Sequence, residues 1–370
     1  MLLLRLKYAA LSAILTTLAA AGSAAAGVYG FDSANPYTAE EKILDIKYLP
    51  LQIRNYRADM RENLQMLIDY AKKNNPNFKI ITHEGQELLY RSAWEDARDG
   101  YNLSRRKKGS IEDTTFLSRE NEIPKEPKPD TPEYKYLHSV DAVAVNSLYC
   151  GSGKEQNITF NNSLGLISID YCPTTDDMDR AIVRSVLDKK LLYAFEKREH
   201  AFNDIASQPI INDSAKNVYE VADARNILIM TDDSRYTSKD DFVREIGNTN
   251  YDILVINPLF HARQRFSPDD IRMLQFKKNG GRRLLIAAMN VSEATPEDYF
   301  WDRRWKVGSP SWLVRRSFVD ANGVIAEYWN ENWRRIISKH FKDILLTGFD
   351  GVFFTGLQNH FYFEKQTPLE

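Results

Sequence analysis

Eight short apolar runs, mostly separated by segments with helical spacing, constrain the fold of this chain more than any other feature. Continuous apolar runs of this kind are typical of parallel strands that are covered on both faces. Eight strand–helix units predict an α/β fold, a closed (β/α)8 TIM barrel, and leave an open doubly wound sheet as the alternative. The runs cover residues 78–82, 142–148, 191–195, 227–230, 253–256, 284–291, 324–328 and 351–354.

Helical spacing of apolar residues supports this alternation. Residues 60–71, 178–186 and 333–345 each place apolar side chains on one face of a helix. Ser267 followed by Pro268 is typical of a helix N-cap with proline in the first turn. The sequence therefore predicts helices at these four places.

Residues 91–136 do not fit the alternation. They are rich in charge and hold Pro124, Pro127, Pro129 and Pro132, a composition that favours an extended loop. Because this segment follows the predicted strand at 78–82, we interpret it as an insertion loop on the active-site face, either a lid or a passive surface loop.

The first 26 residues have the pattern of an export signal. Arg5 and Lys7 precede an apolar stretch, and Ala24-Ala25-Ala26 provides a cleavage site. We expect residues 1–26 to be removed and residues 27–370 to form a single barrel domain. The mature protein would be exported to the periplasm or secreted, with no stable membrane span. An uncleaved anchor is the alternative.

Charge and cysteine content limit the classes of partner and site. The 49 basic and 51 acidic residues give a net charge of -2, which argues against nucleic acid as a partner. The 6 histidines are scattered, and the sequence has no metal-ligand spacing or full phosphate loop, so we expect neither metal nor cofactor. Cys150 and Cys172 could form one disulfide in an oxidising compartment or stay unpaired.

Chemistry in such barrels comes from residues just past the strand ends. Glu293 follows the longest apolar run and is the candidate catalytic acid. Hydrolysis of a glycosidic bond usually needs a second carboxyl, for which Glu84, Glu196, Asp232 and Asp233 are candidates. The candidate substrate-binding residues are His83, Glu84, Asn146, Asp232, Asn257, Tyr328, Trp329 and Thr355.

Three blocks in the second half, residues 250–257, 281–294 and 348–353, carry a family resemblance. They are similar to blocks of the glycoside hydrolase family 114 barrels, the endo-α-1,4-polygalactosaminidase-like proteins also described as related to cysteinyl-tRNA synthetase. The resemblance implies a TIM barrel that acts on an amino-sugar polymer, for example one of the galactosaminogalactan type.

The order of the blocks differs from that of the family. Residues 56–60, 75–78 and 139–143 resemble segments that follow the 348–353 block in the family, whereas here they precede it. The resemblance therefore implies a circular permutant, opened in the loop after the strand at 351–354. The new termini of a closed barrel would lie close together in a surface loop.

Most acids of the family pattern are replaced in this chain. Asn146, Asn257 and Thr355 stand where the family has acidic residues, and Glu293 is retained. Loss of a catalytic carboxylate typically removes orders of magnitude of rate. One hypothesis is therefore a barrel that binds a polysaccharide, an oligosaccharide or a protein partner without hydrolysis. The alternative is an active endo-glycosidase that uses Glu293 with a relocated second carboxylate, Glu84 or Asp232.

Overall fold

Eight parallel strands form the centre of the molecule. The computed structural model describes residues 52–106, 127–150, 164–195, 202–205 and 210–367. The strands are β1 (Lys79–His83), β2 (Ala142–Asn146), β3 (Gly165–Tyr171), β4 (Leu191–Phe195), β5 (Ile227–Met230), β6 (Ile253–Ile256), β9 (Leu284–Asn290) and β13 (Gly351–Thr355).

The strands follow one another around a TIM-like barrel in chain order. Their order in the sheet is β4-β3-β2-β1-β13-β9-β6-β5, and the last strand, β13, pairs in parallel with the first, β1. β4 and β5 lie side by side, but no ladder joins them. The barrel is therefore nearly closed, with a seam between β4 and β5.

Seven of the predicted apolar runs are strands of this barrel, with ends that agree to within two residues. The prediction was wrong for the run at 324–328. That segment contains β12 (Val324–Ala326), which lies in a small antiparallel sheet with β10 (Glu293–Ala294) and β11 (Leu313–Arg316). The remaining barrel strand is β3, which the apolar pattern missed because Ser168 and Asp170 interrupt its apolar residues.

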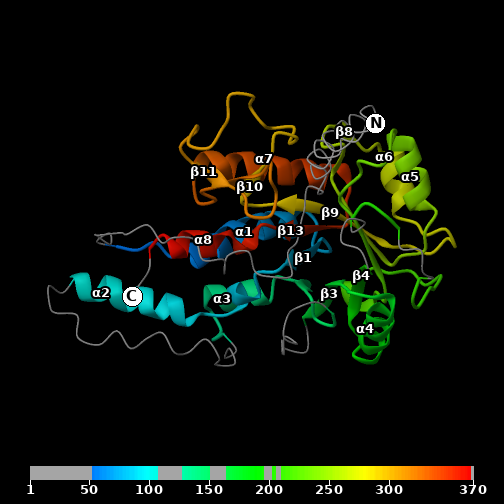
Figure 1. The fold of residues 1–370 in the computed structure, drawn as a ribbon, viewed down its shortest axis with the longest axis horizontal. Coiled ribbons are helices and arrows are strands. Elements are labelled where there is room, and N and C mark those ends of the chain that lie inside the picture. Colours follow the sequence, from blue (N-terminus) through cyan, green and yellow to red (C-terminus); the bar gives the residue numbers. More distant parts are fainter. Residues whose placement is uncertain (1–51, 107–126, 151–163, 196–201, 206–209, 368–370) are drawn as a thin grey trace, which may run out of the picture.

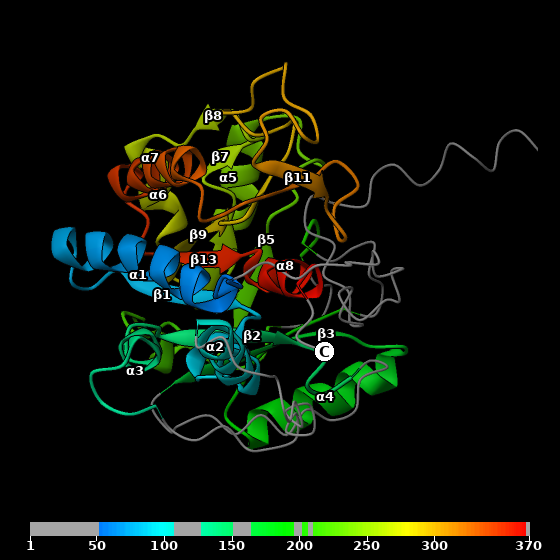
Figure 2. The same ribbon diagram turned by 90° about the vertical axis from the view of Figure 1, so that its left-hand side faces the viewer.

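Helices cover the outside of the barrel, and the four predicted helices are confirmed. Figures 1 and 2 show α1 beside α8. α4 lies away from these two helices, beside β3 and β4. Ser267 forms a full capping box with Asp270. The helices are α1 (Tyr56–Asn74), α2 (Ala93–Arg106), α3 (Pro132–Leu137), α4 (Thr175–Leu187), α5 (Lys239–Gly247), α6 (Pro268–Leu274), α7 (Glu331–Thr347) and α8 (His360–Lys365).

The insertion loop predicted at 91–136 is corrected in part, because α2 and α3 lie within it. The charge and prolines predicted an extended loop, yet two of its acids are buried. Glu95 on α2 and Glu133 on α3 both pair with the buried Arg61 of α1. These ion pairs fix the two helices against the barrel. Residues 107–126 lie outside the described residues.

Three further predictions concern the export signal, the two cysteines and a membrane span. The export signal at 1–26 lies outside the described residues. Cys150 and Cys172, whose pairing the sequence left open, form a disulfide between the ends of β2 and β3. Among the helices of the described ranges, none is both long and apolar enough to cross a membrane.

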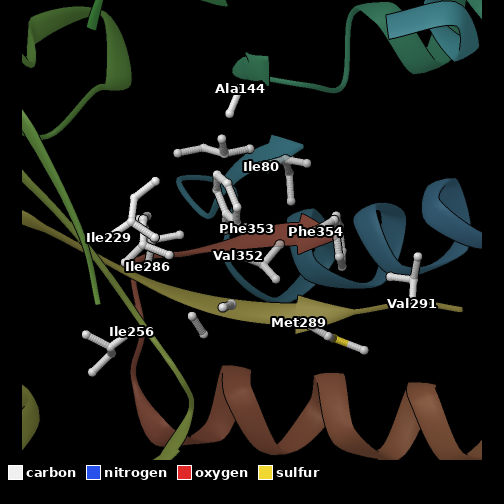
Figure 3. Packing of buried hydrophobic residues seen from close by; sticks show 14 of the residues in the cluster. Ile80, Ala144, Ile229, Ile256, Ile286, Met289, Val291, Val352, Phe353 and Phe354 are labelled. Carbon is white, nitrogen blue, oxygen red and sulfur yellow. The ribbon is translucent and has the colours of Figure 1, made fainter. Parts of the chain in front are cut away.

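Side chains of the barrel strands alternate between the interior and the helix layer. Phe353 stacks on His83 of β1, with ring centroids 5.7 Å apart. Phe354 instead stacks on Phe341 of α7 at 5.8 Å. Figure 3 shows both rings on β13 among the buried side chains of the neighbouring strands. Residues two apart on a strand share a face, so Thr355 faces the interior like Phe353.

Candidate functional site

Polar side chains gather inside the barrel at the carboxyl ends of neighbouring strands. Thr355 pairs in register with Asn290 of β9, so both face the interior. Nε2 of His83 lies 3.1 Å from Oδ1 of Asn146, which brings the ends of β1 and β2 into the same set. Four adjacent strands, β9, β13, β1 and β2, thus each contribute one inward polar side chain. Three of these four residues, His83, Asn146 and Thr355, were predicted from the sequence.

This set is electrically neutral near neutral pH. Burial lowers the pKa of His83 to about 4, so its ring is uncharged. Asn146, Asn290 and Thr355 do not ionise in this range. The hydroxyl of Thr355 is buried and has no hydrogen-bond partner within the described ranges. The interior end of the barrel therefore offers uncharged donors and acceptors.

Asn257 and Thr231 extend the polar lining to β6 and β5. Nδ2 of Asn257 donates a hydrogen bond to the carbonyl oxygen of Thr231 at 2.5 Å. The Thr231 hydroxyl is buried and, like that of Thr355, has no partner in the part of the chain that the structure describes. The predicted residue Asn257 is therefore part of the same lining.

Glu293, the predicted acid, lies at the start of β10 beside this lining and is 5% exposed. Its Oε1 accepts hydrogen bonds from Nδ2 of Asn359 at 2.9 Å and from Oγ of Ser317 at 3.0 Å. Its backbone N–H donates to Oδ1 of Asn290 at 3.0 Å. Burial raises the pKa of Glu293, and the negative charge of Asp320 adds to this effect. A carboxyl of this kind keeps its proton to higher pH, as a general acid must.

A loop between β11 and β12 brings a second carboxyl towards Glu293. Ser317, which donates to Glu293, also accepts the backbone N–H groups of Val319 at 3.1 Å and Asp320 at 3.2 Å. Burial raises the pKa of Asp320 as well. The sequence reasoning missed Ser317 and Asp320 because they follow no barrel strand, and no motif marks them.

Glu84 provides another buried carboxyl, just after β1. Its backbone has a positive φ of 57° and is followed by Gly85 at 74°. A Cβ on Gly85 would lie 2.7 Å from the side chain of Leu357, so this tight turn needs glycine. Oε1 of Glu84 accepts the backbone N–H of Asn146 at 2.9 Å. Burial raises the pKa of Glu84 to about 7.

The turn η5 (Leu357–Asn359) after β13 touches both carboxyls. Asn359 donates to Glu293, and Nε2 of the preceding Gln358 lies 3.4 Å from Oε2 of Glu84. The strands that precede the two acids, β9 and β1, flank β13 on either side. Adjacent strands are about 4.8 Å apart, which puts β9 and β1 about 10 Å apart. Glu84 and Glu293 therefore border the same stretch of the barrel end.

Two predicted aromatic residues lie elsewhere. Tyr328 is fully buried, and its hydroxyl donates to the carbonyl oxygen of Tyr56 at 2.8 Å. Trp329 packs on Tyr56 and on Phe363, at centroid distances of 5.2 Å and 4.6 Å. Both follow β12, which is not a barrel strand, so the structure does not bring them to the polar lining. They join α1 to α8.

The predicted acids near β5 have local partners. Asp232 accepts the backbone N–H of Ser234 at 3.0 Å. Asp233 accepts the backbone N–H of His261 at 2.7 Å, and burial raises its pKa. Glu196 lies outside the described residues. In those residues, no group of three or more His, Cys, Asp or Glu side chains could hold a metal ion.

Comparison with known proteins gives relatives of unknown function. No family model matches the chain. It is 28% identical over 113 residues to an uncharacterized protein of Methanocaldococcus jannaschii, covering 30% of this chain and 32% of that protein. It is 31% identical over 71 residues to an uncharacterized protein of Deinococcus radiodurans, covering 19% of this chain and 23% of that protein. The chain thus matches less than a third of the length of each relative.

Proposed function

We propose that the protein binds an oligosaccharide segment of a polysaccharide at the carboxyl ends of its barrel strands, without efficient hydrolysis. The observation that carries this proposal is the neutral inward lining of His83, Asn146, Asn290 and Thr355. Amide side chains donate and accept hydrogen bonds at once, as the hydroxyls of a sugar do. A neutral lining of this kind does not favour a phosphate or another strongly charged ligand.

The buried hydroxyl of Thr355 supports the same reading. A buried polar group without a partner costs about 1–3 kcal/mol. This hydroxyl has no partner among the residues described, so a ligand hydroxyl that pairs with it would recover that cost. We propose that Thr355, Asn146 and Asn257 hold the ligand where the resembling family has acids.

The second candidate function is hydrolysis, which the environment of Glu293 favours. The raised pKa of Glu293 suits a general acid. Asp320 and Glu84 are the candidates for the second carboxyl. Inverting glycosidases hold their two carboxyls about 6.5–9.5 Å apart, a range compatible with acids carried next to β9 and β1. The raised pKa of Glu84 works against this candidate, because a base or nucleophile must be ionised.

Calorimetric titration with oligosaccharides of partially deacetylated galactosaminoglycan tests the binding proposal. Thr355→Val keeps the shape of the side chain and removes only the hydroxyl. We expect it to weaken binding by about tenfold, because one hydrogen bond is lost. Thr347→Val, which removes a hydroxyl from the end of α7, is the control and should bind like the wild type. Equal affinity in all three proteins would refute the proposed place of binding.

Reducing-end assays on the same polymer separate the two candidate functions. Binding without hydrolysis predicts no product from the wild type or from Glu293→Gln. Product from the wild type that disappears in Glu293→Gln would establish the hydrolase instead.

We also propose that the chain is a circular permutant of the family it resembles. The block order supports this, as does the pairing of β13 with β1, which puts the 348–353 block directly beside the start of the barrel. A chain in which residues 210–367 precede residues 52–205 through a flexible linker should then fold with the same circular dichroism and a similar Tm. An unfolded product would count against the permutation.

A further inference from the structure

At the seam between β4 and β5, the described residues leave part of the outer barrel face uncovered. Leu192 and Ala194 of β4 point to the helix side, yet both are half-buried. In the described residues between β4 and β5, the only helical element is the short turn η4 (Val221–Asp223). Among the described residues, the layer of helices is therefore thin on this side. Next to it, α4 leaves Val183, Val186 and Leu187 exposed.

A cavity of about 80 Å³ lies at this seam. Its apolar wall comes from α4, from both strands and from the segment before β5. The wall includes Met178, Ile182, Val186, Leu192, Ile210 and Leu228. A cavity of this volume suits a slender ligand such as an alkyl chain, whereas an α-helix with its side chains is about 10–12 Å wide and would not enter it.

Two cationic side chains line one end of the same cavity. Lys190 immediately precedes β4, and Arg225 lies two residues before β5, so both belong to the amino end of the sheet. The ammonium group of Lys190 makes no hydrogen bond or ion pair with the described residues. The guanidinium of Arg225 donates to the carbonyl oxygens of Ala222 and Ala224 at 2.9 and 2.7 Å, and no carboxylate of the described ranges pairs with it. The backbone N–H of Arg225 donates to Oδ2 of Asp252 at 2.8 Å. Ser185, Asn212 and Asn226 also line the cavity, so its wall is mostly apolar and its charged side chains, Lys190 and Arg225, are both cationic.

We infer that this seam is a binding site for an aliphatic monocarboxylate, with the carboxylate at Lys190 and the alkyl chain between α4 and the two strands. Small-molecule sites combine an apolar wall with a few polar groups that fix orientation, and this cavity has that composition. The ammonium group of Lys190, which has no partner among the described residues, matches the single charge of a carboxylate. The alkyl chain would cover Leu192, Ala194 and Val186.

Binding at the seam has a consequence for the barrel. The ligand would contact both β4 and β5, which no ladder joins. A ligand that binds the folded state alone stabilises it. We therefore expect the Tm to rise with decanoate concentration. This site lies on the outer face of the barrel, away from the proposed saccharide site. Its test is therefore independent of the test of saccharide binding.

Calorimetric titration with decanoate, octanoate and hexanoate tests the inference, with 1-decanol as the neutral control. Affinity should rise by about fourfold for each CH₂ that becomes buried. Lys190→Gln should weaken decanoate binding by about tenfold, because the carboxylate loses its charged partner. Lys189→Gln is the matched control, since this neighbouring lysine is exposed and does not line the cavity.

Ala194→Leu tests the path of the alkyl chain, because it fills the cavity from β4. It should abolish decanoate binding while circular dichroism shows an intact fold. Equal loss in Lys189→Gln and Lys190→Gln, equal affinity for 1-decanol, or no binding at millimolar decanoate would each overturn the inference.

Discussion

Burial, more than ion pairing, sets the protonation of the acids at the end of the barrel. Glu84 and Glu293 both accept hydrogen bonds from neutral groups. Within the described ranges, no cationic side chain forms a hydrogen bond or ion pair with either carboxyl. Hydrogen bonds lower their pKa values, but burial outweighs them. These acids therefore carry less negative charge than the sequence suggests.

The pKa of Glu84 predicts a specific pH dependence of stability. In the folded state it is about 7, whereas the ordinary value is 4.5. Between these values the unfolded chain loses a proton that the folded protein keeps, so the free energy of unfolding falls as pH rises from about 4.5 to about 7. Glu84→Gln should remove this pH-dependent loss. Between pH 4 and pH 8, the free energy of unfolding of the variant should therefore rise by up to about 3 kcal/mol relative to that of the wild type.

Urea unfolding of both proteins at several pH values measures that difference. Other buried acids, such as Asp170 with a pKa raised to about 6, act equally in both proteins and cancel. Glu331→Gln, at an exposed position on α7, serves as the control and should follow the wild type. The same pH slope in Glu84→Gln and the wild type would mean that Glu84 ionises normally.

Part of the candidate site follows from the sequence, and part does not. Glu293, His83, Asn146 and Thr355 could be predicted because each comes at or just after an apolar strand, where barrel folds place their sites. Ser317 and Asp320 could not, because a loop brings them to Glu293 from a different part of the chain. Tyr328 ends an apolar run that was predicted to be a barrel strand. That run instead pairs in a small antiparallel sheet, so Tyr328 does not lie at the end of the barrel.

At the scale of elements, a tyrosine side chain helps to hold the seam together. The hydroxyl of Tyr193 on β4 donates to the carbonyl oxygen of Ile229 on β5 at 2.8 Å. It also accepts the backbone N–H of Phe202 at 2.8 Å. The first bond pairs a carbonyl of β5 that a regular ladder would otherwise satisfy, and the second pairs a backbone N–H of the loop after β4.

Tyr193→Phe should therefore lower the free energy of unfolding by about 1–3 kcal/mol, because two buried backbone groups lose their partner. Chemical denaturation measures the change. Tyr136→Phe is the matched control, because this hydroxyl is also buried but has no partner within the described part of the chain. If both variants lose the same stability, the hydrogen bonds of Tyr193 are not what matters at the seam.

The ion pairs of Arg61 hold three helices together. Its guanidinium, on α1, pairs with Glu95 on α2 and with Glu133 on α3, the latter at 2.8 Å. Arg61→Met would leave two buried carboxylates unpaired, and we expect it to cost about 3–5 kcal/mol. Arg335→Met breaks an exposed pair with Glu331 and should cost less than about 1 kcal/mol. Thermal or urea unfolding of the two variants compares them, and similar losses would contradict this account.

At the scale of the whole molecule, the barrel was predictable because most of its strands are continuous apolar runs. β3 was not predicted, because its outward residues Ser168 and Asp170 are polar and interrupt the apolar run. In the structure their side chains are satisfied: Asp170 accepts a hydrogen bond from Ser168 and lies 3.4 Å from the backbone nitrogen of Tyr149. The seam between β4 and β5 could not be predicted either, because an apolar run does not show whether a strand pairs on both edges. Strand composition reports burial, whereas closure of a barrel depends on register and spacing.

The central claim is that the carboxyl end of the barrel binds an oligosaccharide. Hydrogen–deuterium exchange, measured by mass spectrometry with and without saturating galactosaminoglycan oligosaccharide, tests it most directly. We expect slower exchange in the segments just past β1, β2, β9 and β13, around Glu84, Ser147, Glu293 and Gln358, and unchanged exchange in α4 and α5. Protection confined to other surfaces, or none at saturating ligand, would contradict the claim.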